Sequence, residues 1–266
     1  MGDARTRVDF GKVCIQKVDL PFPTDEDFLS TSSTIDSYES EEDLTSSCSD
    51  SDESVELNGD TPLVFLDTET NGLFDEDDPL YVPEMLQICL KYKNRTFNRY
   101  IQPTSDIEDE ASYVNGLTII NGRLCHHGDY VLTVDLSECL HSLLFWLNEV
   151  KESAGGRKPI LIAHHGFGFH FKILCHTLDM CNLREGAYEV IGGFADTLDL
   201  ARKFISQDSV RNYQLRSLAM RFFNMHVPNE AKAQAMAVQK IFMNHLSEHF
   251  NAEEVYTYNN FSNSVI

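Results

Sequence analysis

The stretch LVFLDTETNGLF, residues 63–74, carries the strongest structural signal in the chain. Its apolar beginning is typical of a strand buried on both faces, and Asp67 and Glu69 follow where that strand ends. Side chains two positions apart in a strand point to the same side of the sheet, so the two carboxylates should be neighbours. Neighbouring carboxylates repel each other unless a cation joins them. The stretch therefore predicts a site for a hard divalent ion, and the alternative is a pair of solvated acids at a strand end.

The sequence after this strand alternates between the periods of strands and helices. Strands are expected at 85–93, 96–103, 159–165 and 194–200, with a turn at Asn94-Arg95. Helices are expected at 135–150, 167–180, 213–224 and 229–250, the first capped by Thr133 or Asp135. Strands first and alternating strands and helices afterwards predict an α/β fold, with a mixed sheet flanked by helices.

Several motifs resemble, in this order, those of the DnaQ-like (DEDDh) 3′-5′ exonucleases. LVFLDTETNGL resembles their first motif, LIAHHGFGFHFKIL (161–174) their second, and YQLRSLAMRF (213–222) the helix beside their substrate groove. The resemblance covers about 62–250 and implies a ribonuclease-H-like fold. In these enzymes the first-motif acids bind two metal ions, which orient a water and stabilise the leaving oxygen during phosphodiester hydrolysis.

Three of the five residues that name this family are replaced. The second-motif Asp falls on His170, the third-motif His on Asn229 and the third-motif Asp on Gln234. Asp67 and Glu69 remain, and any Mg²⁺ or Mn²⁺ would be held by them. Because the other carboxylates are lost and Asn229 cannot act as a general base, the resemblance implies a degenerate active site.

The predicted function is weak binding of single-stranded nucleic acid, or of a protein partner, in the former groove. Thr70, His165 and Arg216 are the expected substrate contacts, and His165 occupies the position of a family Asn. One alternative is an active metal-dependent exonuclease, in which His170 joins the retained acids and favours zinc or manganese. Another is a protein-interaction module whose function lies in the acidic segment 24–60. No small-molecule cofactor is expected.

A closer resemblance rests on IQPTSDIEDEASYVNGLT (101–118), GGFADTLDLARKF (192–204) and AMAVQKIF (235–242). These segments resemble the exonuclease-like C-terminal region of a long isoform of the promyelocytic leukaemia protein, which itself lacks the full catalytic set. The resemblance implies nuclear protein partners. The seven cysteines form no CxxC pair, which favours reduced thiols in a nuclear or cytoplasmic protein.

The charge of the chain is concentrated in one segment. Of the net charge of -21, residues 24–60 contribute 13 acids and no Lys or Arg. We therefore predict an acidic, Ser-rich, disordered segment at 1–60, an exonuclease-like domain at 61–250 and a C-terminal tail at 251–266. Such acidity disfavours strong binding to phosphate, although residues 151–240 hold 12 Lys or Arg against 8 acids. No apolar run is long enough for a membrane span.

Overall fold

The computed structural model of the protein describes residues 57, 59–75, 77–78 and 81–265. The chain divides into two units, 1–53 and 54–266, and the described residues all belong to the second. The acidic segment predicted at 1–60 therefore lies almost entirely outside the described residues.

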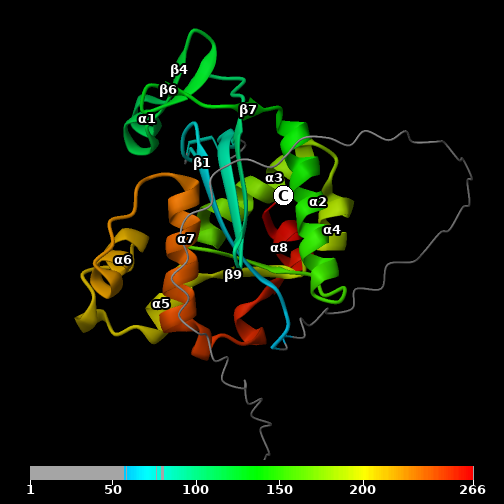
Figure 1. The fold of residues 1–266 in the computed structure, drawn as a ribbon, viewed down its shortest axis with the longest axis vertical. Coiled ribbons are helices and arrows are strands. Elements are labelled where there is room, and N and C mark those ends of the chain that lie inside the picture. Colours follow the sequence, from blue (N-terminus) through cyan, green and yellow to red (C-terminus); the bar gives the residue numbers. More distant parts are fainter. Residues whose placement is uncertain (1–56, 58, 76, 79–80, 266) are drawn as a thin grey trace, which may run out of the picture. The chain divides into compact units, whose positions relative to one another are not determined.

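The described residues form a seven-stranded mixed sheet with strand order β10-β9-β8-β1-β2-β3-β7 (Figure 1). Its members are β1 (Leu63–Thr70), β2 (Met85–Tyr92), β3 (Arg95–Ile101), β7 (Thr133–Val134), β8 (Ile160–Ala163), β9 (Gly193–Asp196) and β10 (Tyr256–Thr257). Strands β1, β2 and β3 pair antiparallel, whereas β8 and β9 continue the sheet parallel to β1. The mixed sheet predicted from the sequence is confirmed.

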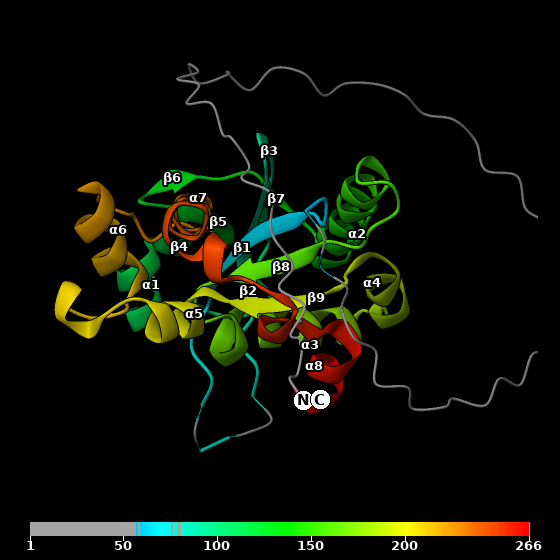
Figure 2. The same ribbon diagram turned by 90° about the horizontal axis from the view of Figure 1, so that it is seen from below.

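Helices cover both faces of this sheet (Figures 1 and 2). One face packs against α2 (Leu136–Ser153), α3 (Phe171–Met180), α4 (Arg184–Val190) and α8 (Tyr258–Val265). The other packs against α5 (Thr197–Phe204), α6 (Leu215–Phe223) and α7 (Ala231–Ile241). None of the helices in the described part of the chain combines the length and apolar character that a bilayer span requires.

The alternation of side chains along β1 explains how one strand serves both layers. Val64 and Leu66 belong to the core under α2 and α3, whereas Phe65 belongs to the core under α6 and α7. Because side chains alternate with period two, Asp67 and Glu69 fall on the same side as Phe65. The fold thus directs both carboxylates toward the layer that contains α7.

A small lobe, residues 109–130, projects from the edge of the main sheet (Figure 1). It was not predicted, and it consists of α1 (Asp109–Asn115), β4 (Leu117–Ile120), β5 (Arg123–His126) and β6 (Asp129–Tyr130). The three strands form an antiparallel sheet whose Leu117 and Leu124 pack on Leu86 of β2. Two-residue turns at Asn121-Gly122 and His127-Gly128, all with positive φ, join the strands.

The four predicted helices are present and differ from the predictions near their ends, whereas α1, α4, α5 and α8 were not predicted. Asp135 caps α2, because its carboxylate accepts the Ser137 N–H at 2.8 Å. The second-motif helix begins with a π-helical turn, η1 (Gly166–His170), before α3. The predicted helix 229–250 is α-helical only to Ile241 and continues as a π-helical turn, η3 (Phe242–Leu246).

Two segments differ from expectation for identifiable reasons. The strand expected at 194–200 ends at Asp196, whose carboxylate accepts the Leu198 N–H at 2.8 Å and starts α5. Residues 251–266 were expected as a tail, but β10 pairs with β9, and α8 buries Tyr258 and Phe261 against the core. The C-terminal residues therefore contribute to the folded unit.

Candidate functional site

The retained carboxylates lie at the carboxyl end of β1, between β8 and β2. Asp67 is only 1% exposed and Glu69 only 8%, which excludes the alternative of two solvated acids. Burial and then the nearby Glu69 charge raise the pKa of Asp67 well above its usual range. The site is a buried carboxylate pair on one side of the sheet, and the raised pKa means that the pair favours binding a proton.

His170 reaches this pair from the end of η1. Nδ1 of His170 lies 3.2 Å from the backbone nitrogen of Thr68 and 2.9 Å from its hydroxyl oxygen; because the backbone N–H can only donate, these contacts favour Nδ1 as the accepting nitrogen. Burial lowers the pKa of His170 to about 3, so the ring is neutral and its one proton is on Nε2. Nε2 lies 3.5 Å from Oδ1 of Asp67. The Nε2 side of the imidazole therefore lies beside Asp67, at a distance longer than an ordinary hydrogen bond.

Gln234, in the first turns of α7, meets the other carboxylate. Its Nε2 donates to Oε1 of Glu69 at 2.7 Å. Burial raises the pKa of Glu69 to about 7, and the Gln234 hydrogen bond and the Arg216 charge limit that rise. Gln234 thus places a neutral N–H group beside Glu69, at the position that the resemblance to the DnaQ-like exonucleases assigns to the third-motif carboxylate.

Asn229 does not join this group. Its Nδ2 donates to the backbone oxygen of Val114 at 2.6 Å, which links the residues before α7 to α1. The residue at the position of the general base therefore contacts the small lobe. The Asn229 side chain thus holds α1 in place. It cannot act as a general base, because an amide does not take up a proton at neutral pH.

The three predicted substrate contacts have different environments. Thr70 is buried and its hydroxyl donates to the Gly72 carbonyl at 2.6 Å, so it has no free donor for a substrate. His165 is exposed and has a left-handed backbone, with φ of 62°. Arg216 is exposed on α6, and its charge acts on Glu69. Of the three side chains, His165 and Arg216 can contact a ligand beside the carboxylates.

Asp196 is a site-forming residue that the sequence reading did not single out. Its carboxylate accepts backbone N–H groups of His165 at 2.9 Å, Phe167 at 3.1 Å and Leu198 at 2.8 Å. These bonds hold the turn that leads into η1, and hence the position of His170. No clear signal in the sequence pointed to this role, because the predicted strand continued to residue 200, whereas the observed β9 ends at Asp196, at the sheet edge where β1 also ends.

His164 is likewise a positioning residue. Its Nδ1 lies 3.0 Å from the Thr197 hydroxyl and its Nε2 lies 2.9 Å from the Tyr213 carbonyl. Burial lowers the pKa of His164 to about 4, so the ring is neutral. Both ring nitrogens are occupied by these contacts, which leaves none for proton transfer at the carboxylate pair.

The side chains present do not fit the family's two-metal centre. Gln234 donates an N–H to one oxygen that would bind a cation, and the neutral ring of His170 lies 3.5 Å from another. Asp67 Oδ2, in contrast, is buried and has no hydrogen-bond partner among the described residues. Nor does the described part of the chain contain a group of three or more His, Cys, Asp or Glu side chains placed to hold a metal ion. Zinc binding by His170 would also require Nε2 to lose its proton.

Replacing Glu69 by glutamine should remove a pH dependence of stability. The pKa of Glu69 rises from 4.5 to about 7 on folding, so the folded protein keeps a proton that the unfolded chain releases. The associated stability is present below pH 4.5 and is lost as the pH rises to about 7. Glu69→Gln should therefore be more stable than the natural protein at pH 8, by about 2–3 kcal/mol.

Urea unfolding between pH 4.5 and 8 measures this difference, with Glu152→Gln as the control because Glu152 is exposed on α2. In the Glu69→Gln variant, the amide oxygen of the new side chain can still accept the Gln234 hydrogen bond, so packing is retained. A pH profile equally steep in Glu69→Gln and in the natural protein would contradict the expectation.

Comparison with known proteins extends these observations. Residues 74–222 match the family described as the Exuperantia RNAse H-like domain. No curated protein matches the sequence. The fold is similar to a structure of exonuclease I that suggests how processivity is achieved, with a TM-score of 0.53 and 11% identity. It is also similar to E. coli exonuclease I in complex with a dT13 oligonucleotide, with a TM-score of 0.52 and 12% identity.

A third similar structure is the zinc-bound form of the E. coli exonuclease I–single-stranded DNA complex, with a TM-score of 0.50 and 14% identity. Each alignment covers 71% of this chain, but only 42%, 42% and 40% of the exonuclease chains. At such identities the likeness establishes the fold alone, which is the predicted ribonuclease-H-like exonuclease fold.

The family match includes the second-motif turn with His170 and most of α6. It begins after Asp67 and Glu69 and ends before Asn229 and Gln234. The matched region nevertheless spans more than half of the 266 residues. The chain is therefore a member of the Exuperantia RNAse H-like domain family.

Proposed function

We propose that this protein is a catalytically inactive member of the exonuclease fold that acts by binding through the former groove. One observation carries the proposal: Gln234 donates an N–H to Glu69, and the neutral ring of His170 lies 3.5 Å from Asp67. A two-metal hydrolase needs anionic oxygens at these positions. Here the buried pair is balanced by neutral donors and by protonation, which leaves the groove without its catalytic charge.

The ligand we propose is single-stranded nucleic acid, bound weakly. Similar folds of E. coli exonuclease I have been solved with a dT13 oligonucleotide and with single-stranded DNA. The exposed side chains of His165 and Arg216 offer a ring and a cation beside the site. Weak affinity follows from the overall acidity of the chain, since phosphate binding depends on clustered cations.

A protein ligand in the same groove is the second candidate, and it rests on the quoted resemblance to the promyelocytic leukaemia protein region. We also propose that the protein is located in the nucleus or the cytoplasm. The alternative of an interaction module driven by residues 24–60 concerns a segment that lies almost entirely outside the described part of the chain. Deletion of 24–60 tests that alternative, because it would abolish partner binding while leaving the groove intact.

An active exonuclease with an altered metal site is the remaining alternative. It draws support from Asp67 Oδ2, the buried oxygen that lacks a hydrogen-bond partner among the described residues. For His170 to become a ligand, however, its proton would have to move from Nε2 to Nδ1, which now accepts from Thr68. Loss of the bond from the backbone N–H costs about 1 kcal/mol, and an Nδ1–H could instead donate to the Thr68 hydroxyl oxygen, 2.9 Å away.

Nuclease assays on the full chain separate these possibilities. A 3′-labelled single strand should remain intact with Mg²⁺, Mn²⁺ or Zn²⁺, and Asp67→Ala should behave like the natural protein. Metal-dependent release of nucleotides that disappears in Asp67→Ala would contradict the proposal of inactivity.

Binding is measured separately, by the fluorescence anisotropy of a labelled single strand. Arg216→Ala should weaken binding about fivefold, because one charge-assisted contact contributes about 1 kcal/mol. Arg99→Ala is the matched control, since Arg99 is exposed on β3 and acts on Cys139 of α2, on the other face of the sheet. Equal effects of the two substitutions would argue against the groove as the nucleic-acid site.

A further inference from the structure

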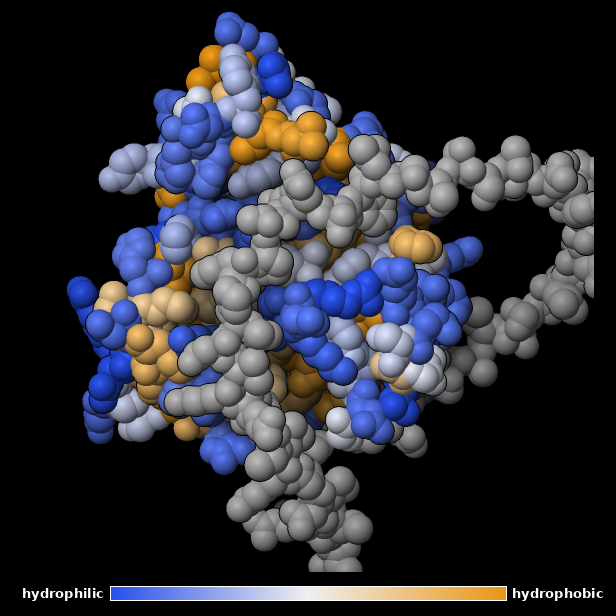
Figure 3. Space-filling view, viewed as in Figure 1, coloured by the Kyte–Doolittle hydropathy of each residue, from blue (hydrophilic) through white to orange (hydrophobic). Residues whose placement is uncertain are grey.

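The outer side of α1 exposes apolar side chains that the other described residues leave uncovered. Tyr113 is 92% exposed, and Leu73 and Val114 are also exposed. On the surface of the lobe that carries α1, apolar areas alternate with hydrophilic ones (Figure 3). Single exposed apolar residues are common, but Tyr113 and Val114 are neighbours on α1. Leu73 lies in the loop after β1 that Asn71 joins to Glu108, and the three side chains together indicate an interaction surface.

The pattern along α1 places an acid beside each of its two exposed apolar side chains. Asp109 and Tyr113 are four residues apart on the helix, and so are Glu110 and Val114. Residues at this spacing are neighbours on a helix surface. We call the surface formed by Leu73, Asp109, Glu110, Tyr113 and Val114 the α1 face.

The α1 face is held rigidly by its opposite side. Asn115 is buried and its Nδ2 donates to the Thr70 carbonyl at 3.0 Å. The Glu108 N–H donates to the Asn71 carbonyl at 2.9 Å. Asn229 donates to the Val114 carbonyl at 2.6 Å. A helix fixed in this way loses little conformational entropy when it binds a partner.

The surroundings of the α1 face are strongly acidic. Residues 71–90 and 102–122 together contain nine Asp or Glu and no Lys or Arg. The two segments are packed together, because the Glu84 carboxylate accepts the Thr104 N–H at 2.7 Å. The pKa of Tyr81 is raised by burial and then by the charge of Glu108, with smaller contributions from other acids nearby. The negative charges of these two segments are therefore concentrated in one region, around the start of α1.

We propose that the α1 face docks a protein segment in which Lys or Arg side chains are interleaved with apolar ones. The cations would meet Asp109 and Glu110, and the apolar side chains would cover Leu73 and Val114. The Tyr113 ring can accept a cation on its face or pack against an aliphatic side chain. Charge complementarity excludes nucleic acid here, because the acids repel phosphate. The inference is independent of ligand binding in the groove.

Peptide binding to the full chain tests the proposal. The probe is a labelled peptide of repeated Arg, Leu and Ser, and its matched comparators are the same peptide with Glu in place of Arg and a labelled oligo-dT strand. Tyr113→Ala and Glu110→Lys should each weaken binding of the Arg peptide at least about tenfold. The Glu peptide should not bind, and oligo-dT binding should not respond to either substitution.

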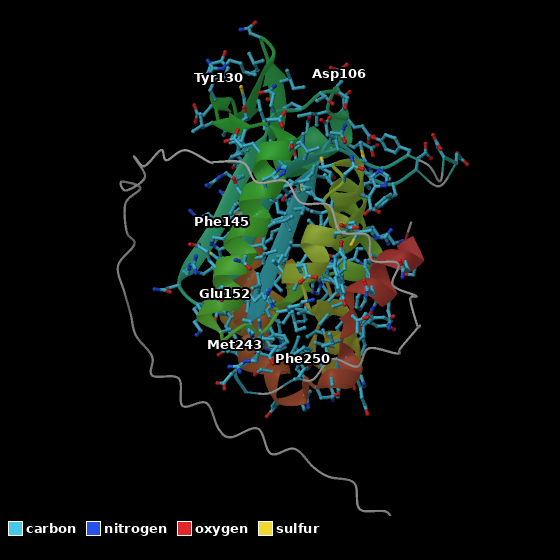
Figure 4. The ribbon with its side chains drawn as sticks, turned by 90° about the vertical axis from the view of Figure 1, so that its right-hand side faces the viewer. Asp106, Tyr130, Phe145, Glu152, Met243 and Phe250 are labelled. Carbon is cyan, nitrogen blue, oxygen red and sulfur yellow. The ribbon has the colours of Figure 1, made fainter. Side chains whose placement is uncertain are left out.

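Matched controls are available on α2, where Phe145 and Glu152 lie well away from Asp106, which is three residues before the start of α1 (Figure 4). Both are exposed, so Phe145→Ala and Glu152→Lys repeat the two chemical changes elsewhere. These controls should leave the affinity unchanged.

Two results would overturn the proposal. One is an equal loss of affinity in the α1-face variants and the controls, which would indicate non-specific attraction to an acidic chain. The other is absence of Arg-peptide binding at about 1 mM, which is weaker than useful docking. Loss of oligo-dT binding in Tyr113→Ala would assign the surface to nucleic acid and overturn it as well.

Discussion

Replacing His170 and Gln234 together by aspartate should make the stability of this protein depend on a divalent metal. The double variant would bring two more carboxylates to Asp67 and Glu69 in a buried position. Without a cation, their mutual repulsion and desolvation should lower the free energy of unfolding by about 3 kcal/mol or more. The natural protein avoids this cost because both replaced positions supply N–H donors.

Urea unfolding with a chelator, and again with Mn²⁺, measures the effect. A metal at a hundred times its dissociation constant should restore about 2.7 kcal/mol to the double variant. The natural protein should not respond. The control is Gln207→Asp with His226→Asp, which makes the same two chemical changes at exposed positions.

Two outcomes would contradict this expectation. If the natural protein gains as much stability from Mn²⁺ as the variant does, Asp67 and Glu69 already hold a metal and the proposal of inactivity fails. If the variant is destabilised but Mn²⁺ does not restore it, the two positions do not face the carboxylates in solution as they do in the structure.

The parts of the fold predicted from sequence are those with strong local signals. β1 is marked by a continuous apolar run, and α2 combines apolar residues at helical spacing with a capping Asp135. The common side of Asp67 and Glu69 follows from the period of a strand alone. These features need no knowledge of residues distant in the sequence.

The chemistry of the site depends on long-range contacts that no local pattern contains. Gln234 meets Glu69 across 165 positions of the chain, and Thr68 meets His170 across 102. The substitutions were visible in the sequence, but the directions of the N–H groups were not. These directions distinguish two kinds of site. In one, the carboxylates face N–H groups of the protein; in the other, they bind a metal ion other than magnesium.

The unpredicted lobe had a partial signal. Asn121-Gly122 is a dipeptide typical of a tight hairpin, and it does join β4 to β5. The second turn, His127-Gly128, places a histidine at a positive φ, which its residue type does not suggest. Strands as short as β6 also give too few residues for a period to be recognised.

Phe261→Ala should lower the free energy of unfolding by about 3–5 kcal/mol, because the ring is buried in an aromatic cluster. Its centroid lies 5.5 Å from that of Phe167, 6.0 Å from that of Phe171 and 5.2 Å from that of Phe194. The sequence alone places Phe261 in a polar tail, where the same substitution would change little. Urea unfolding of the full chain therefore decides between the two descriptions.

Phe145→Ala is the matched control, since it removes the same atoms from a ring that is 67% exposed, whereas Phe261 is 6% exposed. The control should change the free energy of unfolding by less than about 0.5 kcal/mol. Phe167 lies in η1, the turn that ends at His170, so the loss of Phe261 should also loosen the position of the imidazole beside Asp67. If the two substitutions have equal and small effects, α8 does not pack on the core, and the aromatic cluster cannot be what fixes the second-motif turn.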